Sequence, residues 1–82
     1  MIAAENLQKL YAILVRVLGV QESAITDTMS PSTVPSWDSY NALMLVSELE
    51  TKFNVHFTMD EVVAVQNVGD MKGALKKHGV VL

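Results

Sequence analysis

The 82-residue sequence contains no cysteine. A disulfide framework and a thiolate metal site are therefore excluded, and a reducing cytoplasm is the expected location. Only 18% of the residues are charged whereas 50% are hydrophobic, the reverse of the balance found in disordered chains. Because a chain of this length buries only about 60% of its unfolded surface, residues 1–82 are expected to form a single domain.

No stretch of the sequence has the character of a membrane span or a signal peptide. Glu5, Lys9 and Arg16 interrupt the apolar residues near the start, and no small-residue cleavage site follows them. The net charge is -3, and the acidic residues gather between positions 21 and 69. A basic stripe that could neutralise phosphates is missing, so nucleic acid is not an expected partner. Proteins with basic docking surfaces are expected instead.

The spacing of the apolar residues predicts helices. From Ala3 to Leu18 they recur every three or four positions, and Gly19 follows where a left-handed helix cap is expected. Residues 20–37 are rich in Ser, Thr and Asp and contain two prolines. They predict a long connection with, at most, a short helical turn at residues 21–24.

A second helix is predicted to begin at Ser39. Asp38 is a suitable N-cap, accepting a hydrogen bond from the Asn41 amide and meeting the positive end of the helix dipole. The residues predicted to face the core are Ala42, Leu45, Val46, Leu49 and Phe53. Leu43 and Met44 are apolar but lie beside this stripe. Their position is compatible with deep burial, a ligand cavity or a partner surface.

Two further caps complete the predicted fold. Thr58 predicts the start of a short third helix over residues 59–65, and Asn67 predicts a fourth helix that ends before Gly79. The expected architecture is all-α: a four-helix bundle with three long helices, a short third helix, and a long loop between the first two.

Catalytic and metal sites find little support in the sequence. A serine nucleophile needs a base held by a third group, whereas His56 lies in a predicted link and His78 at a helix end. The four glycines form no phosphate-binding loop, and residues 20–37 lack the alternating oxygen ligands of a calcium loop. We therefore predict that the domain is not an enzyme and binds no metal.

The run Trp37-Asp38-Ser39-Tyr40 and the apolar helix after it resemble the Asp-Ser-Leu motif and second helix of acyl carrier proteins. The downstream residues that share the pattern are Leu43, Leu45, Val46, Leu49, Glu50 and Phe53. The order of the elements and the chain length fit as well. The resemblance implies that Ser39 carries a 4'-phosphopantetheine arm derived from coenzyme A, whose terminal thiol holds an acyl group as a thioester. It also implies two kinds of partner, a phosphopantetheinyl transferase and the enzymes that load and process the acyl group.

The resemblance implies roles for further residues. Asp38 would help the transferase and its magnesium engage the site, and Tyr40, Leu43 and Met44 would flank the arm. The candidates for pairing with basic partner surfaces are Glu48, Glu50, Asp60 and Glu61. A monomer is expected, since a carrier must visit several enzymes.

Several residues depart from the fatty-acid carrier pattern. Tyr40 replaces the usual Leu, Trp37 replaces a small residue, and Asn41 and Met44 occupy positions that are often acidic. These departures indicate a specialised carrier in a polyketide, unusual-lipid or glycan-modification pathway. Two alternatives stay open at this point, a peptidyl or aminoacyl carrier and an unmodified helical adaptor that binds its partner through Leu43 and Met44.

Overall fold

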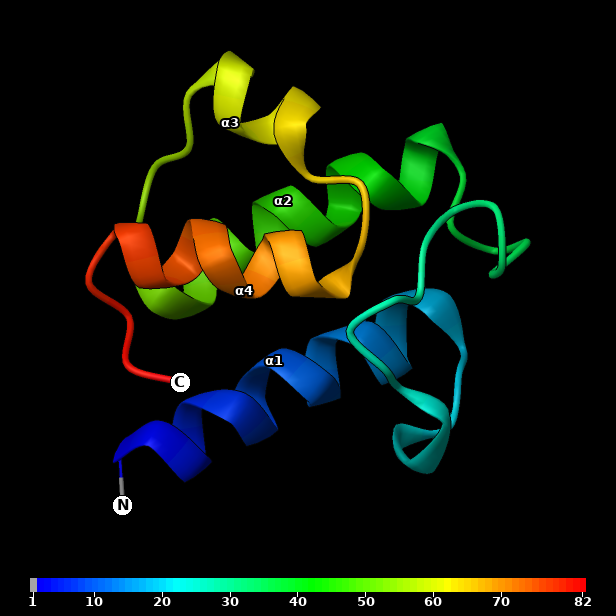
Figure 1. Cartoon of the computed structure of the whole chain (residues 1–82), viewed down its shortest axis with the longest axis horizontal. Coiled ribbons are helices and arrows are strands. Elements are labelled where there is room, and N and C mark those ends of the chain that lie inside the picture. Colours follow the sequence, from blue (N-terminus) through cyan, green and yellow to red (C-terminus); the bar gives the residue numbers. More distant parts are fainter. Residues whose placement is uncertain (1) are drawn as a thin grey trace.

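The computed structural model describes residues 2–82 (Figure 1). Its elements are α1 (Ile2–Leu18), a 3-10 turn η1 (Glu22–Ala24), α2 (Ser39–Phe53), α3 (Met59–Ala64) and α4 (Val68–Lys77). Within residues 2–82 there is no strand, so the predicted all-α bundle with a short third helix is confirmed. None of the helices in this part of the chain has the length and hydropathy that a membrane span requires.

One apolar core joins α1, α2, α4 and the long loop. The buried residues are Leu10, Ile13, Leu14 and Leu18 of α1, Leu45 and Leu49 of α2, Val68, Met71 and Leu75 of α4, and Met29, Val34 and Trp37 of the loop. In Figure 1, α2 and α4 lie between α1 and α3. No residue of α3 is buried, so this helix covers the edge of the core.

The predicted core stripe of α2 is buried to different depths. Leu45 and Leu49 are 1% and 2% exposed, whereas Ala42, Val46 and Phe53 are half-buried. Ala42 and Val46 lie nearer the short α3, which closes over them incompletely. Leu45 and Leu49 therefore make the main contribution of α2 to the core.

Hydrogen bonds hold the long loop against the bundle. The Ser36 hydroxyl donates to the Leu18 carbonyl at 2.6 Å, and the Gly69 amide donates to the Asp27 carbonyl at 2.8 Å. Lys72 of α4 donates to the Asp27 carboxylate at 2.6 Å, a contact that raises the pKa of Lys72 above its ordinary value. The loop is thus fixed at several points before the chain enters α2.

Candidate functional site at the start of α2

The second helix begins where the sequence predicts it. Asp38 has an extended backbone (φ -98°, ψ -176°), and its Oδ1 accepts a hydrogen bond from the Asn41 amide at 2.8 Å. Its carboxylate also meets the positive end of the helix dipole. The predicted N-cap is confirmed, and Ser39 is the first residue of the helix.

Asp38→Ala is expected to lower the free energy of unfolding by about 1 kcal/mol, because the Asn41 amide loses its acceptor. Asp38→Asn is the matched control, since it keeps an acceptor oxygen and should retain most of this stability. Urea unfolding followed by circular dichroism measures both variants. An Asp38→Ala variant as stable as the native chain would contradict the role assigned to the cap.

The Ser39 hydroxyl is exposed and is not needed by the fold. Asp38 supplies the cap, and no hydrogen bond of the Ser39 side chain occurs within residues 2–82. The amides of Ser39 and Tyr40, in the first helical turn, have no acceptor inside the helix. Such amides, together with the helix dipole, favour an anion such as a phosphodiester. A reachable hydroxyl therefore stands next to a helix end that suits a phosphate group.

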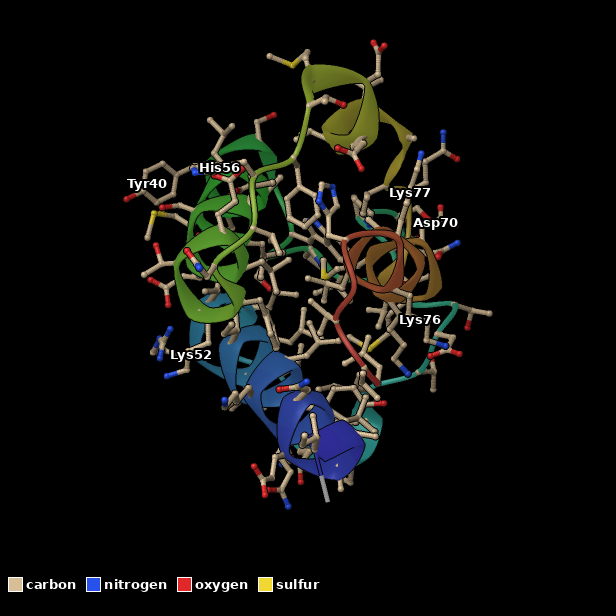
Figure 2. The ribbon with its side chains drawn as sticks, turned by 90° about the vertical axis from the view of Figure 1, so that its left-hand side faces the viewer. Tyr40, Lys52, His56, Asp70, Lys76 and Lys77 are labelled. Carbon is tan, nitrogen blue, oxygen red and sulfur yellow. The ribbon has the colours of Figure 1, made fainter. Side chains whose placement is uncertain are left out.

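The two aromatic residues beside Ser39 lie in opposite environments. Trp37 is 5% exposed and belongs to the core, whereas Tyr40 is 70% exposed. Figure 2 shows Tyr40 pointing away from the bundle, on the opposite side from Asp70, Lys76 and Lys77. Trp37 therefore anchors the chain just before the helix, and the Tyr40 ring stays accessible next to Ser39.

Leu43 and Met44 lie one turn after Ser39 and Tyr40. Leu43 is 67% exposed and Met44 is 37% exposed. The sequence allows deep burial, a ligand cavity or a partner surface for these two residues. Deep burial is wrong for both, because they face away from the buried Leu45 and Leu49. Their contact with an attached arm or a partner stays a prediction.

The four candidate acidic residues do not form one cluster of free charges. Glu48 pairs with Arg16 of α1, and Oε2 of Glu50 accepts a hydrogen bond from the Phe57 amide at 2.8 Å. Asp60 is exposed near the start of α3. Their pairing with basic partner surfaces stays a prediction, and Glu48 and Glu50 also hold elements of this chain together.

Glu61, the fourth candidate, links α3 to α4. Its Oε1 accepts a hydrogen bond from the Thr58 amide at 2.8 Å, which completes a capping box, and its Oε2 lies 2.8 Å from Nε2 of His78. The His78 ring packs edge-on against Phe57, with ring centroids 5.2 Å apart. The sequence shows the capping box but not the pair with His78, because that contact depends on how α3 and α4 pack.

The Glu61 contacts predict a change in acid stability. The Thr58 amide, assisted by His78, lowers the pKa of Glu61 below its ordinary value of 4.5. Ionised Glu61 therefore contributes stability above the unfolded-state pKa, and this contribution is lost as the pH falls through the folded-state pKa. In Glu61→Gln the free energy of unfolding should fall less steeply between pH about 5 and about 3.

Urea titrations at several pH values measure this slope. Asp60→Asn is the control, because it removes the neighbouring exposed carboxylate and should keep the native slope. If the Glu61→Gln and native slopes coincide, the Thr58 and His78 contacts do not stabilise the ionised carboxylate.

An apolar cavity of about 60 Å³ lies beneath α3. Its lining comes from α2 (Ala42, Leu45, Val46 and Leu49), from α3 and its flanks (Phe57, Glu61, Val62 and Val65), from α4 (Met71 and Ala74) and from Trp37. The cavity thus adjoins the helix that begins with Ser39.

Among the described residues, no three acidic or histidine side chains are placed to hold a metal ion.

Residues 8–75 match the family model described as the phosphopantetheine attachment site. The matched segment contains the start of α2 and all of α3. Domains of this family are carriers without catalytic activity of their own, and they hold a covalently attached 4'-phosphopantetheine. They work with a phosphopantetheinyl transferase and with partner enzymes. The resemblance to carrier proteins is thereby confirmed, and the chain belongs to the phosphopantetheine attachment site family of carrier domains.

Proposed function

We propose that the protein is an acyl carrier protein whose 4'-phosphopantetheine arm is attached to Ser39. The observation that carries this proposal is the exposed Ser39 hydroxyl at the first residue of α2, with the capping role already filled by Asp38. Ser36, the nearest other serine, donates its hydroxyl to the Leu18 carbonyl and is half-buried. Ser47 lies in the middle of α2, where the helix amides are already paired.

The residues at the start of α2 fit the transfer of the arm from coenzyme A. The Ser39 Oγ forms a bond to the phosphorus next to the pantetheine, the pyrophosphate bond breaks, and adenosine 3',5'-bisphosphate leaves. The hydroxyl proton passes to the transferase. Oδ1 of Asp38 serves the cap, which leaves Oδ2 for the transferase and its magnesium. When bound, the arm supplies a terminal thiol that holds the cargo as a thioester.

Mass spectrometry after incubation with coenzyme A, magnesium and a broad-specificity phosphopantetheinyl transferase tests the attachment. The native chain should gain the mass of one arm. No gain, under conditions that load a reference carrier, would contradict the proposal.

The cavity beneath α3 favours an acyl cargo over an aminoacyl one. Apart from Glu61, the side chains that line the cavity are apolar. Entry of a hydrocarbon chain is therefore favourable, whereas an amino group would lose its hydration there. An aminoacyl or peptidyl cargo is the second candidate. Membership in the attachment-site family favours either carrier over an unmodified adaptor.

A hexanoyl-loaded carrier is expected to be more stable than the form with a free thiol. Each methylene that enters the cavity should raise the free energy of unfolding by about 0.8 kcal/mol until the space is filled. A glycyl-loaded carrier is the matched control and should unfold like the free-thiol form. Chemical denaturation measures all three species, and equal stability of the hexanoyl and glycyl forms would favour the second candidate.

The proposal extends to a specialised pathway. Near the attachment serine, Tyr40 stands in place of the usual Leu, and Met44 occupies a position that is often acidic in fatty-acid carriers; both side chains are exposed. A polyketide, unusual-lipid or glycan-modification pathway is therefore proposed in preference to bulk fatty-acid synthesis. We also propose that the protein is a monomer and acts in the cytoplasm. Its lack of cysteine fits a reducing compartment, in which disulfides are rare.

A further inference from the structure

An open groove of about 620 Å³ lies along the long loop between α1 and α2. We refer to it as the loop groove. It has the size of a small-molecule site, and among the described residues that line it none is charged. Its apolar side chains include Leu18, Val20 and Val34, and its hydroxyl groups belong to Thr26, Thr28, Thr33 and Ser36.

The hydroxyl groups of Thr26 and Thr28 are only partly used by the fold. Their Oγ1 atoms lie 3.2 Å apart, and no other hydrogen bond of these two side chains occurs within residues 2–82. A threonine hydroxyl has one proton and two lone pairs, so the pair keeps one proton and three lone pairs for a ligand. Both residues are exposed. The loop groove can therefore donate to a carbonyl and accept from an amide.

The loop groove lies within reach of the proposed attachment serine. Ser36, which lines it, precedes Ser39 by three residues, so their Cα atoms are at most about 11 Å apart. Figure 1 shows the long loop at the end of the bundle where α2 begins. Beyond its phosphate, the arm consists of a pantoyl unit, a β-alanyl unit and cysteamine. With the phosphate it is about as long as four extended residues, roughly 13 Å.

We infer that the pantetheine part of the arm, while its thiol is free, lies in the loop groove. This inference rests on the proposed attachment at Ser39. Pantetheine is uncharged, with two amides and a hydroxyl that match the threonine hydroxyls, and with two methyl groups that match the apolar wall. The phosphate stays at the start of α2, where the helix amides favour it. Because the arm is tethered, its effective concentration at the groove is about millimolar, so weak contacts suffice.

The loop groove and the cavity beneath α3 offer the arm two different positions. The two sites share no residue, and the cavity is the apolar one of the two. A hydrocarbon cargo therefore favours the cavity, and its entry draws the arm out of the loop groove. A ligand that prefers one of two states shifts the population towards that state. We thus expect the position of the arm to depend on its cargo.

Contacts measured by NMR between the arm and the chain test the position of the free-thiol arm. The chain is labelled with carbon-13 and nitrogen-15 and loaded from unlabelled coenzyme A, with the thiol kept reduced. Isotope-filtered spectra should show contacts from the two pantoyl methyl groups to Val20, Thr28 and Val34. The amide resonances of Thr26 and Thr28 should also shift between the unloaded and loaded chains. Contacts to Val62 and Val65 of the cavity instead, or no contacts beyond Ser39 and its neighbours, would overturn the inference.

A variant that fills the loop groove gives an independent check. Ala24 is exposed and lines the groove, so Ala24→Phe should occupy the space and abolish the arm contacts. Gln21→Phe is the matched control, because Gln21 is also exposed and flanks η1 but does not line the groove. It should keep the contacts of the native chain. Circular dichroism confirms that both variants are folded, and contacts that persist in Ala24→Phe would contradict the assigned position.

The hexanoyl-loaded chain tests the dependence on cargo. Its arm should lose the contacts to Thr28 and Val34 and gain contacts to Val62 and Val65, whereas unchanged groove contacts would overturn the exchange between the two sites. Intact-mass spectrometry precedes each experiment. A native chain that gains no arm, while a reference carrier does, would overturn the attachment at Ser39. A chain that is loaded but shows no groove contacts would overturn only the position of the arm.

Discussion

Trp37→Ala is expected to lower the free energy of unfolding by about 3 to 5 kcal/mol, a large part of the stability of a small domain. The Trp37 side chain is 5% exposed and packs in the core formed by α1, α2 and α4. Its removal leaves a cavity under the last turn of the long loop. Since Trp37 directly precedes the N-cap Asp38, the start of α2 should lose its support as well.

Tyr40→Ala is the matched control, because it removes an aromatic side chain of similar size three residues further on. Tyr40 is 70% exposed, so its loss should change the free energy of unfolding by less than about 0.5 kcal/mol. Urea unfolding followed by circular dichroism measures both variants. Equal losses in the two variants would contradict the different environments of the two rings.

The helix ends could be predicted from the sequence because they depend on neighbouring residues. Asp38, Thr58 and Asn67 each accept a hydrogen bond from the amide three residues later, as short-range patterns indicate. Gly19 and Gly79, with φ values of +69° and +87°, follow α1 and α4 where left-handed conformations are expected. Such features need no knowledge of how the helices pack.

Contacts between elements could not be predicted in the same way. The pair formed by Glu61 and His78 joins residues 17 positions apart, and its geometry depends on the relative placement of α3 and α4. The cavity beneath α3 likewise depends on how closely the short helix approaches α2. The sequence predicts that Trp37 attaches the loop to the core. The exposure of Tyr40 could not be predicted, because it depends on the orientation of α2 relative to Trp37.

One motif and its setting predict the candidate site. The sequence placed Ser39 at a helix start and assigned the cap to Asp38, and the structure confirms that geometry. It did not reveal that Glu48 and Glu50 are engaged inside the chain, because Arg16 and the Phe57 amide reach them only in the folded bundle. The engagement of these two carboxylates is therefore visible only in the structure.

Ser39→Ala is expected to abolish loading and to leave the fold intact. Its Oγ is the atom that would form the bond to phosphorus, so no acceptor for the arm remains. No side-chain hydrogen bond within the described residues is lost, and Ala is the best helix former, so the free energy of unfolding should stay within about 0.5 kcal/mol of the native value. Loading followed by intact-mass spectrometry, with circular dichroism as the check on folding, measures both expectations.

The most direct measurement of the attachment site is tandem mass spectrometry of the loaded native chain after trypsin cleavage. Cleavage after Arg16 and Lys52 releases residues 17–52 as one peptide, since no other Lys or Arg lies between them. This peptide contains every serine of the chain, namely Ser23, Ser30, Ser32, Ser36, Ser39 and Ser47. A single arm located on Ser39 is the predicted result, whereas an arm on any other serine, or none on the peptide, would contradict the assignment of Ser39 as the attachment site.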